Sequence, residues 1–175
     1  MTAFEEPAPI DPEAPRYGPP LPFPPTRYLP GWTARPGTAD LETGRSDERP
    51  WEESGATPLF RRGVDLYNRA YFWEAHEAWE TLWHRCPPGT PLREGLQGLI
   101  QLAAALLKEH QGVPEGARKL SRTALERLER ARAGDAALPL DLASLVARAR
   151  GHFAPLDTPG APVMPRPAIR LTDSK

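Results

Sequence analysis

The sequence has little cysteine and no long apolar run. The single cysteine, Cys86 among 175 residues, cannot form an intramolecular disulfide or supply a thiolate zinc site, which needs several ligands at defined spacing. No stretch approaches the ~18 apolar residues of a membrane span. The first residues also lack the basic and apolar regions of a signal peptide. We therefore expect a cytoplasmic protein that does not enter membranes.

Concentrated positive charge is missing as well. The formal net charge is −1, and residues 59–153 carry 14 basic and 11 acidic side chains. Nucleic-acid binding needs many clustered phosphate contacts, usually seen as a basic face. No glycine-rich phosphate loop and no serine elbow occurs. The sequence predicts neither a nucleic-acid partner nor these common catalytic motifs.

Proline is abundant but unevenly distributed. Of 23 prolines, 13 lie in residues 1–58, five in 59–153 and five in 154–175. Dense proline disfavours helices and favours extended chain. We predict a largely disordered or extended tail at 1–57, a helical domain at 58–153 and a second Pro-rich tail at 154–175. Within the first tail, Tyr28, Leu29 and Trp32 are expected to lie over the domain and cover an apolar patch.

The middle segment has helical periodicity, since its apolar residues recur three and four apart. Proline at a helix's first turn costs nothing, and four such prolines predict helix starts: Pro58, Pro91, Pro114 and Pro139. The expected helices lie near 58–69, 71–85, 91–111, 114–133 and 139–151. They predict an all-α fold, a compact bundle of two tetratricopeptide-like hairpins and a closing helix.

Residues 71–84 hold three tryptophans and two histidines. On a helical wheel His76 falls within the apolar arc and Glu80 lies at its rim, whereas Glu74 and Glu77 project toward solvent or a groove edge. The first helix is expected to turn Arg62 and Asp65 outward. Burying an imidazole or a carboxylate costs several kcal/mol unless it is paired, so His76 and Glu80 stand out.

Three interpretations of this stretch compete. His76 and Glu80 can form a structural pair one turn apart. Alternatively, His76, Glu77 and Glu80 can bind zinc, manganese or iron, although a second histidine of the protease pattern is missing and another helix would have to contribute. Finally, tryptophans can line a ligand or peptide groove in which Glu77 and Glu80 contact a polar group. The possible contributors from the third helix and the groove tryptophans are Gln97, Gln101, His110, Trp73, Trp79 and Trp83.

Several blocks resemble one known family. They are Gly63 to Asn68, Tyr71 to Trp83, Gln97 to Leu106, and the Gly-x-Pro-x-Gly-Ala run from Gly112 to Ala117. In this order they look like the prokaryotic domain of unknown function family 309, over about 59–130. The resemblance implies a small all-helical bundle and a loosely suggested metal-dependent hydrolase activity. The polar signature positions that it implies are Glu74, His76, Glu77, Glu80, Gln97 and Gln101.

The leading hypothesis is a polar pocket between the second and third helices that binds a small ligand or a partner protein. Its residues are Glu74, His76, Glu77, Glu80, Trp83, Gln97 and Gln101. One alternative is a metal-dependent hydrolase in which His76, Glu77 and Glu80 hold a divalent ion. The other is a structural or scaffold protein that recruits a partner through its Pro-rich head.

Overall fold

The computed structural model describes residues 5–37 and 50–172; the parts of the predicted tails outside these ranges are not described. Within these ranges the fold is all-α, as predicted, and an isolated antiparallel bridge between Leu140 and Leu171 is the only β-pairing. None of the described helices is long and apolar enough to cross a membrane. A 3-10 helix, η2 (Trp51–Ala56), precedes five α-helices: α1 (Pro58–Asn68), α2 (Phe72–Trp83), α3 (Pro91–His110), α4 (Pro114–Ala133) and α5 (Leu142–Asp157).

Three of the four predicted helix starts are confirmed. Pro58, Pro91 and Pro114 each open a helix. Thr57 and Thr90 cap the first two of these helices, because their side chains accept hydrogen bonds from the amides three residues later. Such a cap satisfies an amide that the helix itself leaves unpaired. The local sequence therefore determines where α1, α3 and α4 begin.

The prediction for the last helix was wrong at both ends. Pro139 does not open α5; Asp141 caps it by accepting a hydrogen bond from the amide of Ser144. The helix then continues through Pro155 to Asp157. Proline has no amide to donate, so it removes one helical hydrogen bond. Pro155 stands in the last turn of α5, where this loss does not interrupt a longer helix.

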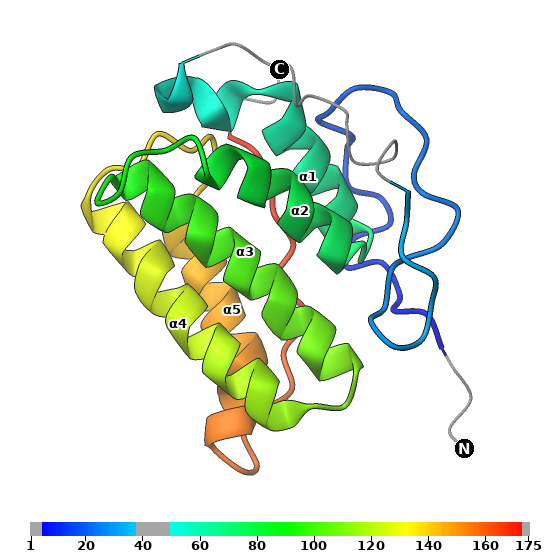
Figure 1. The fold of residues 1–175 in the computed structure, drawn as a ribbon. Coiled ribbons are helices and arrows are strands. Elements are labelled where there is room, and N and C mark those ends of the chain that lie inside the picture. The colour runs from blue at the N-terminus through cyan, green and yellow to red at the C-terminus, as the bar shows by residue number, and fades with distance from the viewer. Residues whose placement is uncertain (1–4, 38–49, 173–175) are drawn as a thin grey trace.

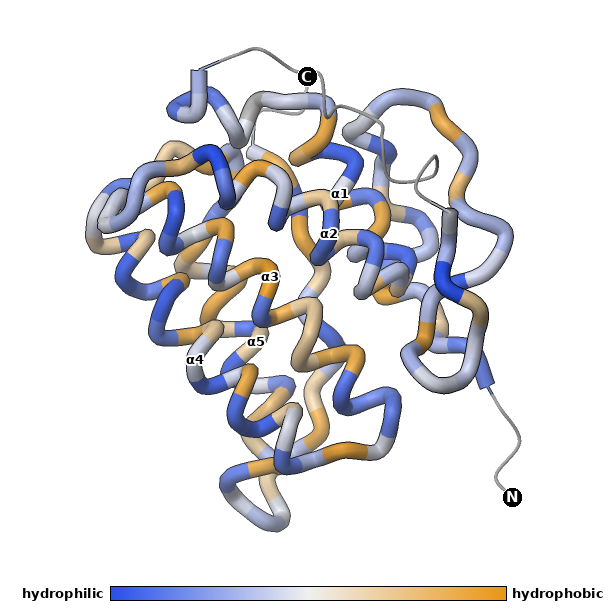
Figure 2. The backbone as a smooth tube through the Cα atoms, in the orientation of Figure 1, coloured by the Kyte–Doolittle hydropathy of each residue, from blue (hydrophilic) through white to orange (hydrophobic). Residues whose placement is uncertain are grey.

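The core forms around α3, which packs against α2 on one side and α4 on the other, while α5 packs on α4 (Figure 1). Hydrophobic and hydrophilic positions alternate along α3 and α4 with the helical turn (Figure 2), the pattern of an amphipathic helix. The largest fully buried side chains are Trp79, Tyr67, Phe60, Phe72 and several leucines. The predicted likeness to tetratricopeptide hairpins stays a prediction.

Gly63 lets α1 and α2 come close together. A Cβ atom at this position would clash with the indole ring of Trp79. The indole Nε1 donates to the Phe60 carbonyl at 3.3 Å. The group that approaches Gly63 is thus an aromatic side chain of α2, not a helix backbone.

The N-terminal segment 5–37 packs on α1 and changes what its polar residues do (Figure 1). Asp65 accepts hydrogen bonds from the amides of Tyr17 and Gly18 at 2.8 and 3.0 Å. Arg62 donates to the Leu21 and Pro22 carbonyls. Both side chains are buried, so the expectation that they face solvent was wrong. The segment makes only short-range backbone hydrogen bonds of its own, so its extended parts have free backbone groups, and these polar side chains pair with them.

The C-terminal segment packs on the last turn of α1. Asn68 makes a two-way pair with Ile169: its side-chain amide donates to the Ile169 carbonyl at 2.7 Å, and its side-chain oxygen accepts from the Ile169 amide at 2.8 Å. The Tyr67 hydroxyl donates to the Pro167 carbonyl at 2.8 Å. Both tails therefore meet polar side chains of the same helix.

Candidate functional site

Helix α2 has one apolar face and one polar face. Phe72, Ala75, Trp79 and Leu82 are buried, as expected for side chains three and four residues apart. Predicted to lie within this arc, His76 instead lies at its edge, with 27% of its side chain exposed. The imidazole is therefore positioned between the core and solvent.

His76, Glu77 and Glu80 form a compact cluster on the polar face. One potential ligand atom from each lies within 4.8 Å of the other two. The His76 Nδ1 atom is 3.3 Å from a carboxylate oxygen of Glu77, but it is buried and makes no hydrogen bond. The pairing that we expected between His76 and Glu80 is thus a three-residue group in which Glu77 takes part.

Glu74 lies about one turn before Glu77 on α2, and its predicted position toward solvent or a groove edge was wrong. The side chain is buried because the N-terminal segment covers it. One carboxyl oxygen accepts a hydrogen bond from the Tyr28 amide at 2.8 Å, and the other has no partner. Burial raises the pKa of Glu74 to about 7, although the Tyr28 hydrogen bond opposes the shift.

The segment that covers Glu74 also borders the polar face of α2. The Tyr28 ring meets Trp73 edge-on at 4.7 Å between centroids, and Leu29 is buried. Gln111, just after α3, donates to the Pro30 carbonyl at 3.2 Å. Trp32, expected to cover an apolar patch, remains 50% exposed. Residues 28–30 therefore reach from the start of α2 to the end of α3.

Trp83 is the last residue of α2. The Arg93 guanidinium lies 3.9 Å from the centroid of the Trp83 ring and donates to the Trp83 carbonyl at 2.9 Å. This contact fixes the ring against α3. The Trp83 indole N–H is nevertheless buried without a hydrogen-bond partner, so a donor is left unused beside the polar face.

Gln97 and Gln101 are half-buried on α3, which runs beside α2 (Figure 1). The Gln101 side-chain carbonyl is buried without a partner. In the described part of the chain neither glutamine is hydrogen-bonded to the α2 cluster. His110 stands at the end of α3 and is not in the cluster. The structure brings together His76, Glu77 and Glu80, and it leaves the glutamines as neighbours.

Two cavities are described, and neither is lined by α2. The larger lies between α4 and α5, and the smaller is lined by residues around Leu140 and the C-terminal segment. The predicted pocket between α2 and α3 therefore stays a prediction. What the structure adds on that face is a group of polar atoms without partners.

Sequence reasoning overlooked His152. Its two ring nitrogens face the Met164 carbonyl at 2.8 Å and a Glu109 carboxylate oxygen at 3.0 Å. Burial alone would lower the pKa of His152, but these two acceptors outweigh it and raise the pKa. Both ring nitrogens can donate only in the protonated ring. His152 thus joins α3, α5 and the C-terminal segment, and no local sequence signal marks it because its partners are distant in the chain.

Comparison with known proteins confirms the resemblance over a shorter range than we inferred. The model of the domain of unknown function DUF309 matches residues 60–120. This range runs from α1 through α2 and α3 into α4, and it contains every residue of the α2 cluster. No curated protein and no solved structure matches the chain.

Proposed function

Because residues 60–120 form a DUF309-like domain, we propose that this domain binds a divalent metal ion on the polar face of α2, through His76, Glu77 and Glu80. The observation that carries the proposal is the 4.8 Å limit on the separation of their ligand atoms. Ligand atoms around one ion stand about 2.0–2.2 Å from it, so they lie within roughly 4 Å of one another. Small side-chain rotations close the remaining difference.

The donor set supports particular metals. One imidazole nitrogen and two carboxylate oxygens suit zinc, manganese or iron(II), whereas the absence of thiolates from the cluster disfavours copper(I). The buried His76 Nδ1 atom also supports the proposal, because its Glu77 contact at 3.3 Å is not a hydrogen bond and burying an imidazole nitrogen without one is unfavourable. A metal ion would be its partner.

Three protein ligands leave coordination positions open to water and to a ligand, which is the arrangement of catalytic zinc sites. An ion there would lower the pKa of a bound water and polarise a carbonyl or phosphoryl oxygen, the chemistry of a metal-dependent hydrolase. The chain's own contribution is to hold the ion and to border it with the Trp83 ring. Hydrolysis is thus the activity that we propose to look for first.

A second candidate is a polar-ligand site that works without metal. The buried Trp83 N–H and Gln101 carbonyl have no partners, and they supply one donor and one acceptor. A ligand with an acceptor and a donor of its own would satisfy both. This candidate shares the α2 face with the metal site but does not require His76.

Metal analysis distinguishes the two candidates. We expect protein purified without chelator or histidine tag to contain close to one equivalent of zinc, manganese or iron, and His76→Ala and Glu80→Ala to lose it. His84→Ala is the matched control, because His84 follows the same helix but lies outside the cluster. Equal metal content in all variants, or no rise in melting temperature on adding these metals, would contradict the metal site and leave the polar-ligand site.

A further inference from the structure

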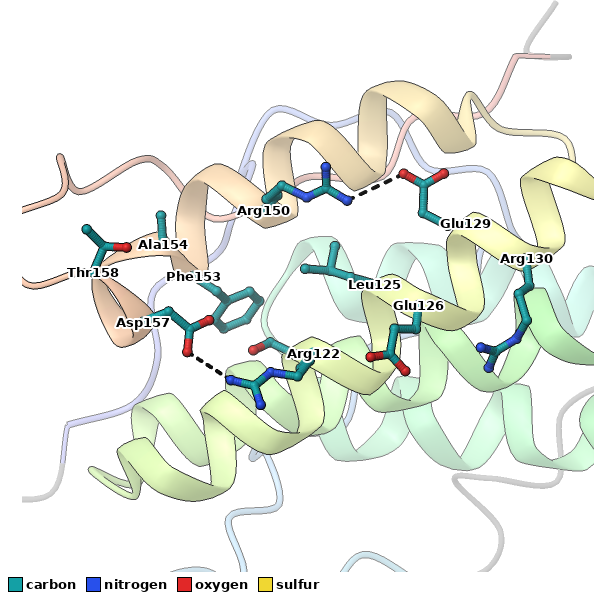
Figure 3. Close-up of a pocket in the computed structure, with 11 residues that line it drawn as sticks. Arg122, Leu125, Glu126, Glu129, Arg130, Arg150, Phe153, Ala154, Asp157 and Thr158 are labelled. Carbon is teal, nitrogen blue, oxygen red and sulfur yellow. Dashed lines mark hydrogen bonds and ion pairs between the residues drawn. The ribbon is translucent and has the colours of Figure 1, made fainter.

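The larger cavity lies between α4 and α5, across α3 from the proposed metal site (Figure 1). Its volume is about 660 Å³, which is within the range of pockets that hold small molecules. Figure 3 shows side chains from both helices around it. The family match ends at residue 120, so this cavity is formed by residues beyond it.

The middle of the cavity is apolar. Leu125 from α4 and Phe153 and Ala154 from α5 line it, and Phe153 is only 3% exposed (Figure 3). Phe153 therefore forms a floor that is already fixed by the core. An apolar floor of this kind favours the hydrocarbon or aromatic part of a ligand.

Two ion pairs bridge the two helices at opposite ends of this floor (Figure 3). Arg122 of α4 contacts Asp157 of α5 at 3.2 Å, and Arg150 of α5 contacts Glu129 of α4 at 3.5 Å. Glu126 is the third acidic residue that lines the cavity. Arg122 and Arg130 flank it at four residues on either side, a spacing that lets side chains of one helix interact.

Arg150 is the cation that is least committed to its partner. The 3.5 Å contact is its single described ion pair, and 66% of its side chain is exposed. Glu129 is held more closely by Arg132, at 2.8 Å. Arg150 can therefore turn to another anion while Glu129 stays paired. Arginine is well suited to this exchange because its planar guanidinium binds a carboxylate through two parallel hydrogen bonds.

We propose that the cavity between α4 and α5 binds an amphipathic organic acid, with its apolar body on Leu125 and Phe153 and its carboxylate on Arg150. The α5 side of the cavity runs from Arg150 to Thr158, which is about two turns of helix. A medium-length alkyl chain fits this length. The site is independent of the metal site and needs no metal.

Decanoate and decan-1-ol make a matched pair of probes, because they share the apolar chain and differ in the charge. We expect saturable binding of decanoate to the full chain by isothermal titration, below its micelle concentration, and weaker binding of the alcohol. Arg150→Gln should weaken decanoate binding about tenfold, because the guanidinium–carboxylate pair is lost at a largely exposed side chain. It should leave the alcohol unaffected. Leu125→Asp should weaken binding of both.

Arg148→Gln is the control, because Arg148 is an exposed arginine of the same helix that lines the other cavity. It should bind decanoate like the unaltered protein. Absence of saturable decanoate binding overturns the proposal, and so does equal weakening by the Arg148 and Arg150 variants. Equal affinity for acid and alcohol overturns the role of Arg150. Melting temperatures of all variants check that each is folded.

Discussion

Helices α1 and α2 are neighbours with similar polar content, but their polar side chains have different surroundings. On α1, Arg62, Asp65 and Asn68 are buried, and each is hydrogen-bonded to the backbone of a flanking segment. On α2, His76 has a buried nitrogen with no hydrogen-bond partner, and Glu77 and Glu80 lie beside it, partly exposed. The tails therefore supply hydrogen-bond partners to the polar side chains of α1 but not to the His76 cluster on α2.

This difference separates a structural role from a functional one. A buried polar group that has its partners stabilises a particular arrangement, and removing one partner leaves the other unsatisfied. A group of polar atoms without partners lowers stability unless a water, an ion or a ligand completes it. The α1 face thus attaches the tails, and the α2 face is where the proposed binding site lies.

The largest effect is expected from Asp65→Ala on the α1 face. This change leaves the Tyr17 and Gly18 amides without an acceptor and removes a negative charge near the buried Arg62. Breaking such a buried arrangement costs about 3 kcal/mol. Chemical denaturation should report this loss. Glu126→Ala, at an exposed acid on α4, should change the free energy of unfolding little. If Asp65→Ala leaves the free energy of unfolding unchanged, the comparison fails, because α1 would then hold its tails by other contacts.

The same contrast shows how far a sequence can be interpreted. The starts of α1 and α3 were predictable because Thr57 and Thr90 act within their own turn. The α2 cluster was predictable because its residues are close together on one helix. A helical wheel, however, describes only one helix. It turned Asp65 outward and Glu74 toward solvent or a groove edge, because it cannot include the backbone amides, from a distant part of the chain, that pair with them.

Glu74 lies between the two cases, since one of its oxygens is paired and the other is not. Its pKa is raised to about 7, so the folded protein binds a proton more tightly than the unfolded chain does. The contribution of Glu74 to the free energy of unfolding should therefore be greatest below about pH 4.5 and should fall as the pH rises to about 7. We expect Glu74→Gln to remove this slope and to stabilise the metal-free protein at pH 8 by about 2 kcal/mol. The difference in pKa corresponds to about 3 kcal/mol, and the buried N–H group of the glutamine offsets part of it.

The measurement is a series of urea denaturation curves between pH 4 and pH 8 in the presence of a chelator. Glu126 is the matched comparison, because it is an exposed acid on α4 that is far from Glu74 in the chain. Glu126→Gln should retain the slope that Glu74 causes. If Glu74→Gln destabilises the protein at pH 8, the carboxylate is charged and fully paired there. Glu74 would then belong with the satisfied groups of α1.

The smallest effect on stability is expected from the α2 cluster itself. His76 and Glu77 are partly exposed, and their contact is 3.3 Å long without hydrogen-bond geometry. Partly exposed ion pairs contribute about 0–1 kcal/mol, so His76→Leu and Glu80→Gln should each change the free energy of unfolding of the metal-free protein by less than about 1 kcal/mol.

When metal is present, the α2 cluster should contribute much more to the free energy of unfolding than it does in the metal-free protein. With saturating manganese or zinc, the unaltered protein and His84→Leu should gain stability, because an ion that binds only the folded state stabilises it, and the two cluster variants should not. The readout is the denaturation midpoint with and without metal. If the cluster variants instead lose as much stability without metal as Asp65→Ala does, His76 and Glu80 tie α2 to its neighbours as Asp65 ties α1. The distinction between the two faces would then fail.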